Sequence, residues 1–428
     1  MRAALLGGCL LAGALAPALA ADYSFDLSEI EAQPYEFSGF AEGKLEHFAL
    51  RPDAALYPPA YGASGRRSDL MRGTASGELS GKAKQGALTA YGRLSVSASS
   101  DALGTDTTGT VMEAGARVSP SEGLTFDLGK QVQRWGKGYA WNPVAFFERP
   151  KDPNDPSASR EGFVMVRADG VRSLKGPTMT AIGFEPVLLP VSSSLNTDYG
   201  SSSDANPGAR LYLLVADTDV DLLWAAKGSK PERVGLDFSR NLGSQWEVHG
   251  EWAWAFNATR RWLGSSGQVN TAQTDVDSWL LGARYITASE VTWIGEVYRN
   301  GAGYSEAQLG DYYRLLQGAY APGASPALRN LASSLAQAGY GRANPGRDYA
   351  YLRVSAKDAF GWLYLNPALT TIVNLQDRSW QLTPELSYTG WNNMELRGRI
   401  IWLQGQALTE FGEKATRQRI ELSLKLYF

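Results

Sequence analysis

The chain has 428 residues, of which 44% are hydrophobic and 20% charged, and its formal net charge is -3. This near-neutral balance argues against a basic nucleic-acid binder, and the 13 tryptophans and 20 tyrosines argue against disorder. Beyond residue 20 no apolar run reaches the roughly 18–20 residues of a membrane helix. A large all-β protein remains.

The N-terminus has the organisation of a secretory signal peptide. Arg2 supplies the positive charge, residues 3–16 are apolar, and Ala18-Leu19-Ala20 fits the small-x-small cleavage rule. We predict a signal peptide over 1–20, cleaved near Ala20, and a mature chain over 21–428. The context of Cys9 resembles a lipoprotein box only weakly. Because Cys9 is the only cysteine, the mature chain would contain no disulfide and no thiolate metal site.

The rest of the chain reads as segments of about ten alternating residues separated by turns, which is typical of transmembrane β-barrel strands. The clearest segment is the last, where Ile420, Leu422, Leu424 and Leu426 alternate with polar residues and the chain ends on Phe428. A terminal aromatic resembles the assembly signal of bacterial outer-membrane barrels. The predicted strands are 36–49, 68–81, 86–98, 108–118, 123–133, 162–172, 177–186, 208–216, 219–227, 232–241, 245–256, 276–287, 290–300, 347–357, 363–375, 378–389, 392–403 and 417–428.

The lengths of the connections support this assignment independently. Every second connection is short, as expected of periplasmic turns, and the long connections fall on the other parity, as expected of extracellular loops. The long ones are 50–67, 99–107, 134–161, 187–207, 257–275, 301–346 and 404–416. We therefore predict an antiparallel transmembrane barrel of about 18 strands. The alternative is 16 strands, with residues 210–226 forming one bent hairpin.

The most distinctive connection follows the fifth predicted strand. It is rich in glycine, aromatic and basic residues, and we expect it either to fold into the barrel or to stay outside as a loop stiffened by prolines. If it folds inward, Arg134, Lys137, Tyr139 and Trp141 are candidates for contact with a solute, since aromatic faces flanked by cations suit sugars and carboxylates.

This stretch resembles the porin-like outer-membrane barrels grouped with alginate-export proteins and related uncharacterised families. The residues that carry the resemblance are Gly129, Lys130, Gln131, Trp135, Gly136, Asn142 and Pro143. The match covers roughly fifteen residues, so it supports a barrel and not a particular substrate. The resemblance implies solute passage or polymer export.

Charged residues on the polar faces of other strands are further pore candidates. They are Arg93, Glu247, His249, Glu251, Arg397 and Arg399. The chain has 2 histidines, and His249 lies between two glutamates. A pore-lining role is favoured over a hydrolase using His249, because no nucleophile can be linked to it. Metal-ligand spacing is missing, so we expect neither a metal site nor another cofactor.

The connection 301–346 differs from the others in its leucine spacing of three and four residues, which indicates two short amphipathic helices. They could cap the mouth, plug the lumen or pack on each other. Our leading hypothesis is a non-enzymatic outer-membrane channel for small polar or charged solutes, or for a polymer such as a polysaccharide. The second is a non-conducting barrel in an export, assembly or electron-transfer complex with periplasmic partners. The expected partners are outer-membrane lipid, the barrel assembly machinery and, if the barrel oligomerises, further copies; no nucleic acid is expected.

Overall fold

The computed structural model of the chain describes residues 33–200 and 202–428. The predicted signal peptide (1–20), its cleavage near Ala20 and Cys9 lie outside the described residues. The described part consists of 18 strands in one antiparallel sheet, with short helices in the connections.

The strands are β1 (Tyr35–Leu50), β2 (Asp69–Gln85), β3 (Leu88–Asp101), β4 (Gly104–Ser121), β5 (Leu124–Gln131), β6 (Phe163–Ser173), β7 (Met179–Pro190), β8 (Ala205–Val215), β9 (Thr218–Ala225), β10 (Arg233–Leu242), β11 (Trp246–Leu263), β12 (Val269–Ile286), β13 (Thr292–Arg299), β14 (Asp348–Ser355), β15 (Leu365–Asn374), β16 (Trp380–Trp391), β17 (Met394–Gln404) and β18 (Thr416–Tyr427). The helices are α1 (Tyr57–Tyr61), α2 (Glu306–Ala319) and α3 (Pro326–Leu335), with the single turns η2 (Gly62–Ser64), η3 (Ala336–Tyr340) and η4 (Ala359–Gly361).

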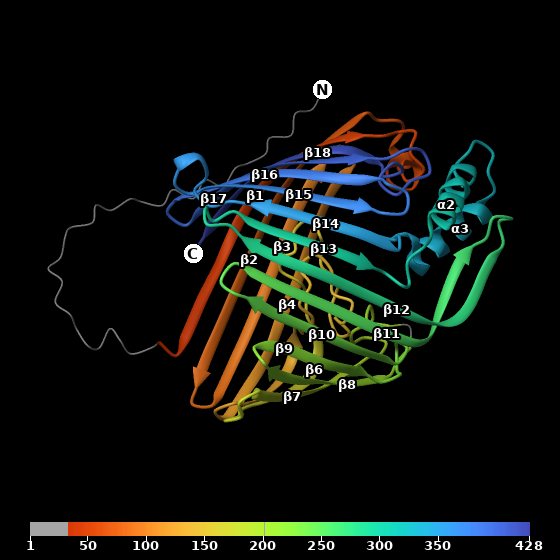
Figure 1. Cartoon of the computed structure of the whole chain (residues 1–428). Helices are drawn as coiled ribbons and strands as arrows, with labels where there is room; N and C mark the ends of the chain where they lie inside the picture. Colours follow the sequence, from red (N-terminus) through yellow and green to blue (C-terminus); the bar gives the residue numbers. More distant parts are fainter. Residues whose placement is uncertain (1–32, 201) are drawn as a thin grey trace. The chain divides into compact units, whose positions relative to one another are not determined.

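Each strand pairs with its neighbours in sequence, and β1 also pairs with β18, so the sheet closes into a barrel without a free edge (Figure 1). The predicted count of eighteen is confirmed over the alternative of 16. The decisive feature is the turn Ala216-Asp217, where both residues have positive φ angles of 47° and 57°. This conformation is that of a tight two-residue hairpin, which makes β8 and β9 separate strands.

The polarity of the barrel is inverted relative to a water-soluble protein. On β18 the outward-facing Leu422 is 51% exposed and Leu424 38%, whereas Glu421 and Ser423 on the other face are only 4% and 5% exposed. Exposed leucines around buried carboxylates would be unfavourable in water, but lipid can cover the first while a hydrated, paired interior accommodates the second. The alternation seen in the sequence therefore corresponds to a lipid face and a lumen face.

Two of the predicted long connections are wrong. Residues 99–107 and 257–275 are mostly strand, because β3 and β4 continue to a turn at Ala102-Leu103, and β11 and β12 continue to a turn at 264–268. Ladder pairing there includes Arg260↔Ala272 and Ser99↔Asp106. The side chains are polar on both faces, so the apolar alternation stops while backbone hydrogen bonding goes on.

The C-terminus takes part in barrel closure. The backbone N–H of Phe428 donates to the carbonyl of Gly39 (3.0 Å), and the N–H of Gly39 donates to the carbonyl of Phe428 (2.9 Å). The Phe428 ring occupies the space that a side chain at position 39 would need. A terminal aromatic fixed at the β1–β18 seam is consistent with the assembly role that we expect for Phe428.

The connection between β13 and β14 forms the two helices expected from the leucine spacing (Figure 1). Ser305 caps α2 through a capping box with Gln308. Leu309, Tyr312, Tyr313 and Leu316 of α2 pack with Leu335 of α3 and with residues such as Leu263 at the end of β11. The helices therefore pack on each other and on the outer ends of strands. Among the described residues, no helix has the length and apolar character that crossing a lipid bilayer would require.

Candidate functional site

The connection between β5 and β6, residues 132–162, lies inside the barrel and is called the inner loop below (Figure 1). Its course begins with glycines that no other residue could replace. Gly136 has a φ of 94°, and a Cβ there would lie 2.7 Å from a Glu251 oxygen; a Cβ on Gly138 would lie 2.1 Å from the Trp141 carbonyl. The glycines of this segment therefore allow a close approach to the wall and a tight turn of the chain.

Buried carboxylates of the wall hold the first part of the inner loop by its backbone. Glu251 on β11 accepts hydrogen bonds from the N–H of Gly138 (2.5 Å) and of Val144 (3.3 Å), and from the Asn142 side chain (2.9 Å). Glu296 on β13 accepts from the N–H groups of Tyr139 and Ala140. Unpaired N–H groups of an irregular segment are thereby satisfied without a strand or helix.

An ion pair and aromatic packing complete this attachment. The Lys137 ammonium lies 2.8 Å from an Asp221 oxygen on β9 and 3.7 Å from an Asp237 oxygen on β10. The Trp141 ring stacks on Tyr298 of β13, with centroids 5.1 Å apart. Lys137, Tyr139 and Trp141 therefore anchor the inner loop to the wall, and the Lys137 ammonium is paired with wall carboxylates.

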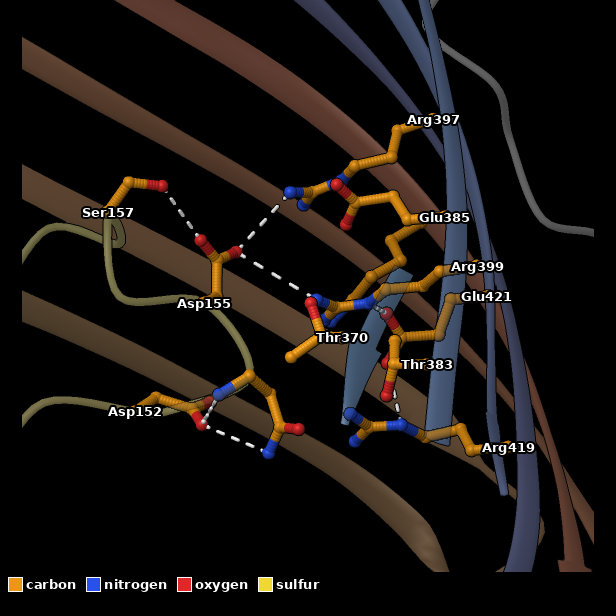
Figure 2. A network of polar contacts seen from close by, with 12 residues as sticks. Asp152, Asp155, Ser157, Thr370, Thr383, Glu385, Arg397, Arg399, Arg419 and Glu421 are labelled. Atoms are coloured by element: carbon orange, nitrogen blue, oxygen red, sulfur yellow. Dashed lines mark hydrogen bonds and ion pairs between the residues drawn. The ribbon is translucent and has the colours of Figure 1, made fainter. Parts of the chain in front are cut away.

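The second part of the inner loop is attached to other strands of the wall. Asn154 accepts a hydrogen bond from Gln381 on β16. Figure 2 shows Asp155 facing Arg397 and Arg399 of β17, at 3.3 Å and 4.0 Å. Ser159 accepts from Arg93 on β3 (3.2 Å). The inner loop thus crosses the lumen from β9–β14 to β16–β17 and then to β3.

Most of the predicted pore residues are engaged in these networks. Arg399 also pairs with Glu421, Arg397 lies 3.9 Å from Glu42, and Arg93 pairs with Glu113 at 2.8 Å. Of the candidate cations, Arg134 alone is exposed and makes no ion pair with any described residue. The predicted pore charges are thus mostly structural counter-ions.

His249, on which the hydrolase hypothesis depended, also has hydrogen-bonding partners in the wall. His249 Nδ1 lies 3.2 Å from Glu247, and Nε2 lies 2.9 Å from Glu296, the residue that holds Tyr139 and Ala140. The imidazole is 3% exposed. It therefore supports the attachment of the inner loop.

Three cavities lie within the barrel, and each shares lining residues with the next. The outer cavity, of about 370 Å³, is lined by residues of the long-connection end such as Trp254, Lys230 and Arg342. The middle cavity, of about 480 Å³, is lined by Arg93, Arg134 and the start of the inner loop. The inner cavity, of about 290 Å³, lies towards the short-turn end and shares Arg93 with the middle cavity.

Sequence reasoning missed the residues at which the outer and middle cavities meet. Both cavities are lined by Glu148, Lys151 and Arg160 of the inner loop. Glu148 pairs with Arg160 (2.5 Å) and accepts from the N–H of Trp135 (2.5 Å). The run of charges and prolines over 148–160 was the available signal, but it does not reveal which charges face a cavity.

Burial changes the pKa values of several of these groups. Burial raises the pKa of Glu148 to about 7, against the opposing effect of Arg160. Burial lowers the pKa of Lys151, with Arg160 adding to the effect, and it lowers that of Lys230 to about 7, with Arg233 and Arg342 adding to the effect. Among the described residues, Glu148 is the only acidic residue lining the outer or middle cavity, so both have a strong excess of cations.

A closed barrel of eighteen strands with a polar interior and a loop inside the lumen is the fold of bacterial outer-membrane porins. No protein-family model and no curated protein sequence matches the chain. The structure is similar to that of OccK5 (OpdH) from Pseudomonas aeruginosa, with 14% identity, a TM-score of 0.51, and 92% of this chain and 97% of that chain covered. It is also similar to OccK2 (OpdF) of the same organism, solved in complex with glucuronate, at 13% identity and a TM-score of 0.51, covering 92% and 96%. These likenesses establish the fold.

Proposed function

We propose that the protein is an outer-membrane channel for the passive passage of small organic anions, carboxylated monosaccharides among them. The observation that carries the proposal is the lining of the outer and middle cavities, in which cations far outnumber the one carboxylate. Low-dielectric walls focus the field of these cations and raise the local concentration of anions. The complex of OccK2 with glucuronate supports a solute of this class.

The size of the cavities favours small solutes over a polymer. Cavities of about 290–480 Å³ fit a single sugar ring, and the attached inner loop leaves no wide lumen. The outer cavity adds aromatic faces, including Trp141 and Tyr298, to its cations. A flat carboxylated ring would satisfy both features. The lipid-facing leucines support the outer membrane as the location, with the long connections at the cell exterior.

The test is ion selectivity in planar bilayers, using the Arg134→Glu variant. Arg134 makes no attachment, so the inner loop should stay in place while the charge in the middle cavity changes sign. Reversal potentials in a KCl gradient should be anion-selective for the unmodified protein and should shift towards cations in the variant, less so near 1 M salt, where the Debye length is about 3 Å.

Lys227→Glu is the matched control, because Lys227 is exposed and lines none of the three cavities. It makes the same change in net charge and should leave the reversal potential unchanged. A protein that inserts but does not conduct would favour the non-conducting component of a larger complex instead.

A further inference from the structure

The junction between the outer and middle cavities is built entirely from the inner loop. Glu148, Lys151 and Arg160 line both cavities, so a solute moving from one to the other passes these side chains. The Glu148 side chain is only 2% exposed and that of Arg160 17%. At this junction the Glu148 carboxylate is therefore less accessible than Arg160, and the side chains around it are cationic.

The groups around Glu148 have the chemistry of a carboxylate-binding site. Arg160 Nη1 donates to one carboxylate oxygen (2.5 Å), and the backbone N–H of Trp135 donates to the other (2.5 Å). Lys151 donates to the carbonyl of Gly138 (2.5 Å) and makes no ion pair with a described residue. A guanidinium, an amide N–H and a free ammonium are the donors by which proteins bind carboxylates.

We propose that Arg160, Lys151 and the Trp135 N–H form a binding site for the carboxylate of a permeating solute, and that ionised Glu148 occupies this site from within the chain. The inference rests on the proposed function, and it adds the position of the solute carboxylate and a built-in competitor for it. Release of Glu148 from Arg160 frees both donors and opens the junction between the cavities.

The competitor depends on pH. Burial raises the pKa of Glu148 to about 7, so the carboxyl is ionised and holds Arg160 above that pH, and is neutral and easily displaced below it. Uronic-acid carboxylates stay ionised throughout this range. Solute binding should therefore be strongest at mildly acidic pH and weaken as pH rises through 7.

Other charged groups lie near the junction, and three of them could produce a pH dependence of their own. Lys151 has a lowered pKa, and loss of its charge at high pH would also weaken anion binding. Lys230 lines the outer cavity, and because its pKa is lowered to about 7, loss of its charge as pH rises through 7 would act in the same direction. His249 on β11 contacts Glu296, which holds the inner loop at Tyr139 and Ala140. The remaining groups are Arg93 on β3, Arg134 and Arg149 on the inner loop, Arg233 at the start of β10, Glu185 on β7, Glu251 on β11 and Arg342 near α3.

The experiment is a calorimetric titration of the detergent-solubilised barrel with sodium glucuronate from pH 6 to 8.5 at constant low chloride, with glucose as the neutral probe. For the unmodified protein, the apparent Kd for glucuronate should rise by roughly tenfold per pH unit above 7, because the competent fraction falls by that factor. In Glu148→Gln, the Kd at pH 8.5 should fall to the value that the unmodified protein has at pH 6. Glucose should show no such dependence.

Two controls assign the effect. Glu161→Gln, at an inner-loop carboxylate that pairs with Lys130 and lines none of the cavities, should keep the full pH dependence. His249→Asn should keep it too. The proposal is overturned if glucuronate does not bind at pH 6, or if the Kd of the unmodified protein is flat across pH. It is also overturned if Glu148→Gln keeps the dependence, which would implicate Lys151 or Lys230, or if His249→Asn abolishes it.

The titration of the unmodified protein needs no variant, so it decides the question even if Glu148→Gln fails to assemble. The binding titration is also independent of the conductance measurement that tests the proposed function. An anion-selective channel with pH-independent glucuronate binding would contradict this inference alone. A barrel that binds glucuronate with the expected pH profile but does not conduct would contradict the proposed function alone.

Discussion

The inner loop and the helical connection between β13 and β14 are both long, yet their backbones are satisfied in different ways. The inner loop has no regular structure, and wall carboxylates such as Glu251 and Glu296 bind its N–H groups. The helical connection satisfies its own backbone in α2 and α3 and buries leucines and tyrosines between them. The first therefore combines polar contacts to the wall with buried aromatic side chains such as Trp135 and Phe146, and the second is a small hydrophobic core at the mouth.

The largest effect should come from Glu251→Gln. Gln retains one acceptor oxygen but places an amide N–H₂ against donors from Gly138, Asn142 and Val144, so some of them lose their partners. The first part of the inner loop should detach, and single-channel conductance should rise severalfold. The neighbouring Glu247→Gln changes a residue that does not contact the inner loop, and its conductance should match that of the unmodified protein. Equal conductance in both variants would mean that the polar attachment does not set the pore width.

An intermediate effect is expected from Leu316→Ala in α2. Leu316 is buried in the helical core, so its truncation should cost about 2–5 kcal/mol of local stability. Trypsin should then cut after Arg314 or Arg329 in the folded barrel, while conductance and selectivity stay unchanged. Leu328→Ala, at an exposed position of α3, should leave both sites protected. A conductance change in Leu316→Ala would show that the helices, and not the inner loop, form the constriction.

The smallest effect should distinguish the role of Lys137 from that of Arg134 in single-channel recordings. Lys137→Gln removes the cation that bridges Asp221 and Asp237 and leaves only Arg210, 3.8 Å from Asp221, which should loosen the inner loop and add noise to the open-channel current. Arg134→Gln should lower anion selectivity slightly and leave the current quiet. Identical traces for the two variants would mean that Lys137 is a pore cation, as its sequence context suggested, and not an anchor.

The sequence was informative about the strands because the lipid face imposes a period of two on every one of them. The alternation of Ile420, Leu422 and Leu424 was sufficient to place β18, whereas the positive φ angles of Ala216 and Asp217 in the structure were needed to establish that β8 and β9 are separate strands. The sequence did not predict the tips of the long hairpins, as at Arg260 and Arg261 on β11. Both faces are polar there, and backbone hydrogen bonding alone leaves no hydrophobic pattern.

The inner loop was harder to predict because its partners depend on the register of the closed barrel. Lys137 appears free in sequence, and nothing local places Asp221 and Asp237 beside it. Glu148 and Arg160 lie in a run of charges and prolines that did not single them out, since their importance comes from facing two cavities. Such residues can be found only once the wall opposite them is known.

The attachment of the inner loop also constrains the order in which the molecule can be built. Asp155 pairs with Arg397, 242 residues later in the chain, and the partner strands β9 to β17 all follow the inner loop in sequence. Contacts this distant cannot form until nearly the whole wall exists, and distant contacts make folding slow. The polar side chains of the lumen must therefore remain hydrated through most of assembly, and seating of the loop must come at or near barrel closure. A nascent barrel would accordingly be wider and more permeable than the finished one.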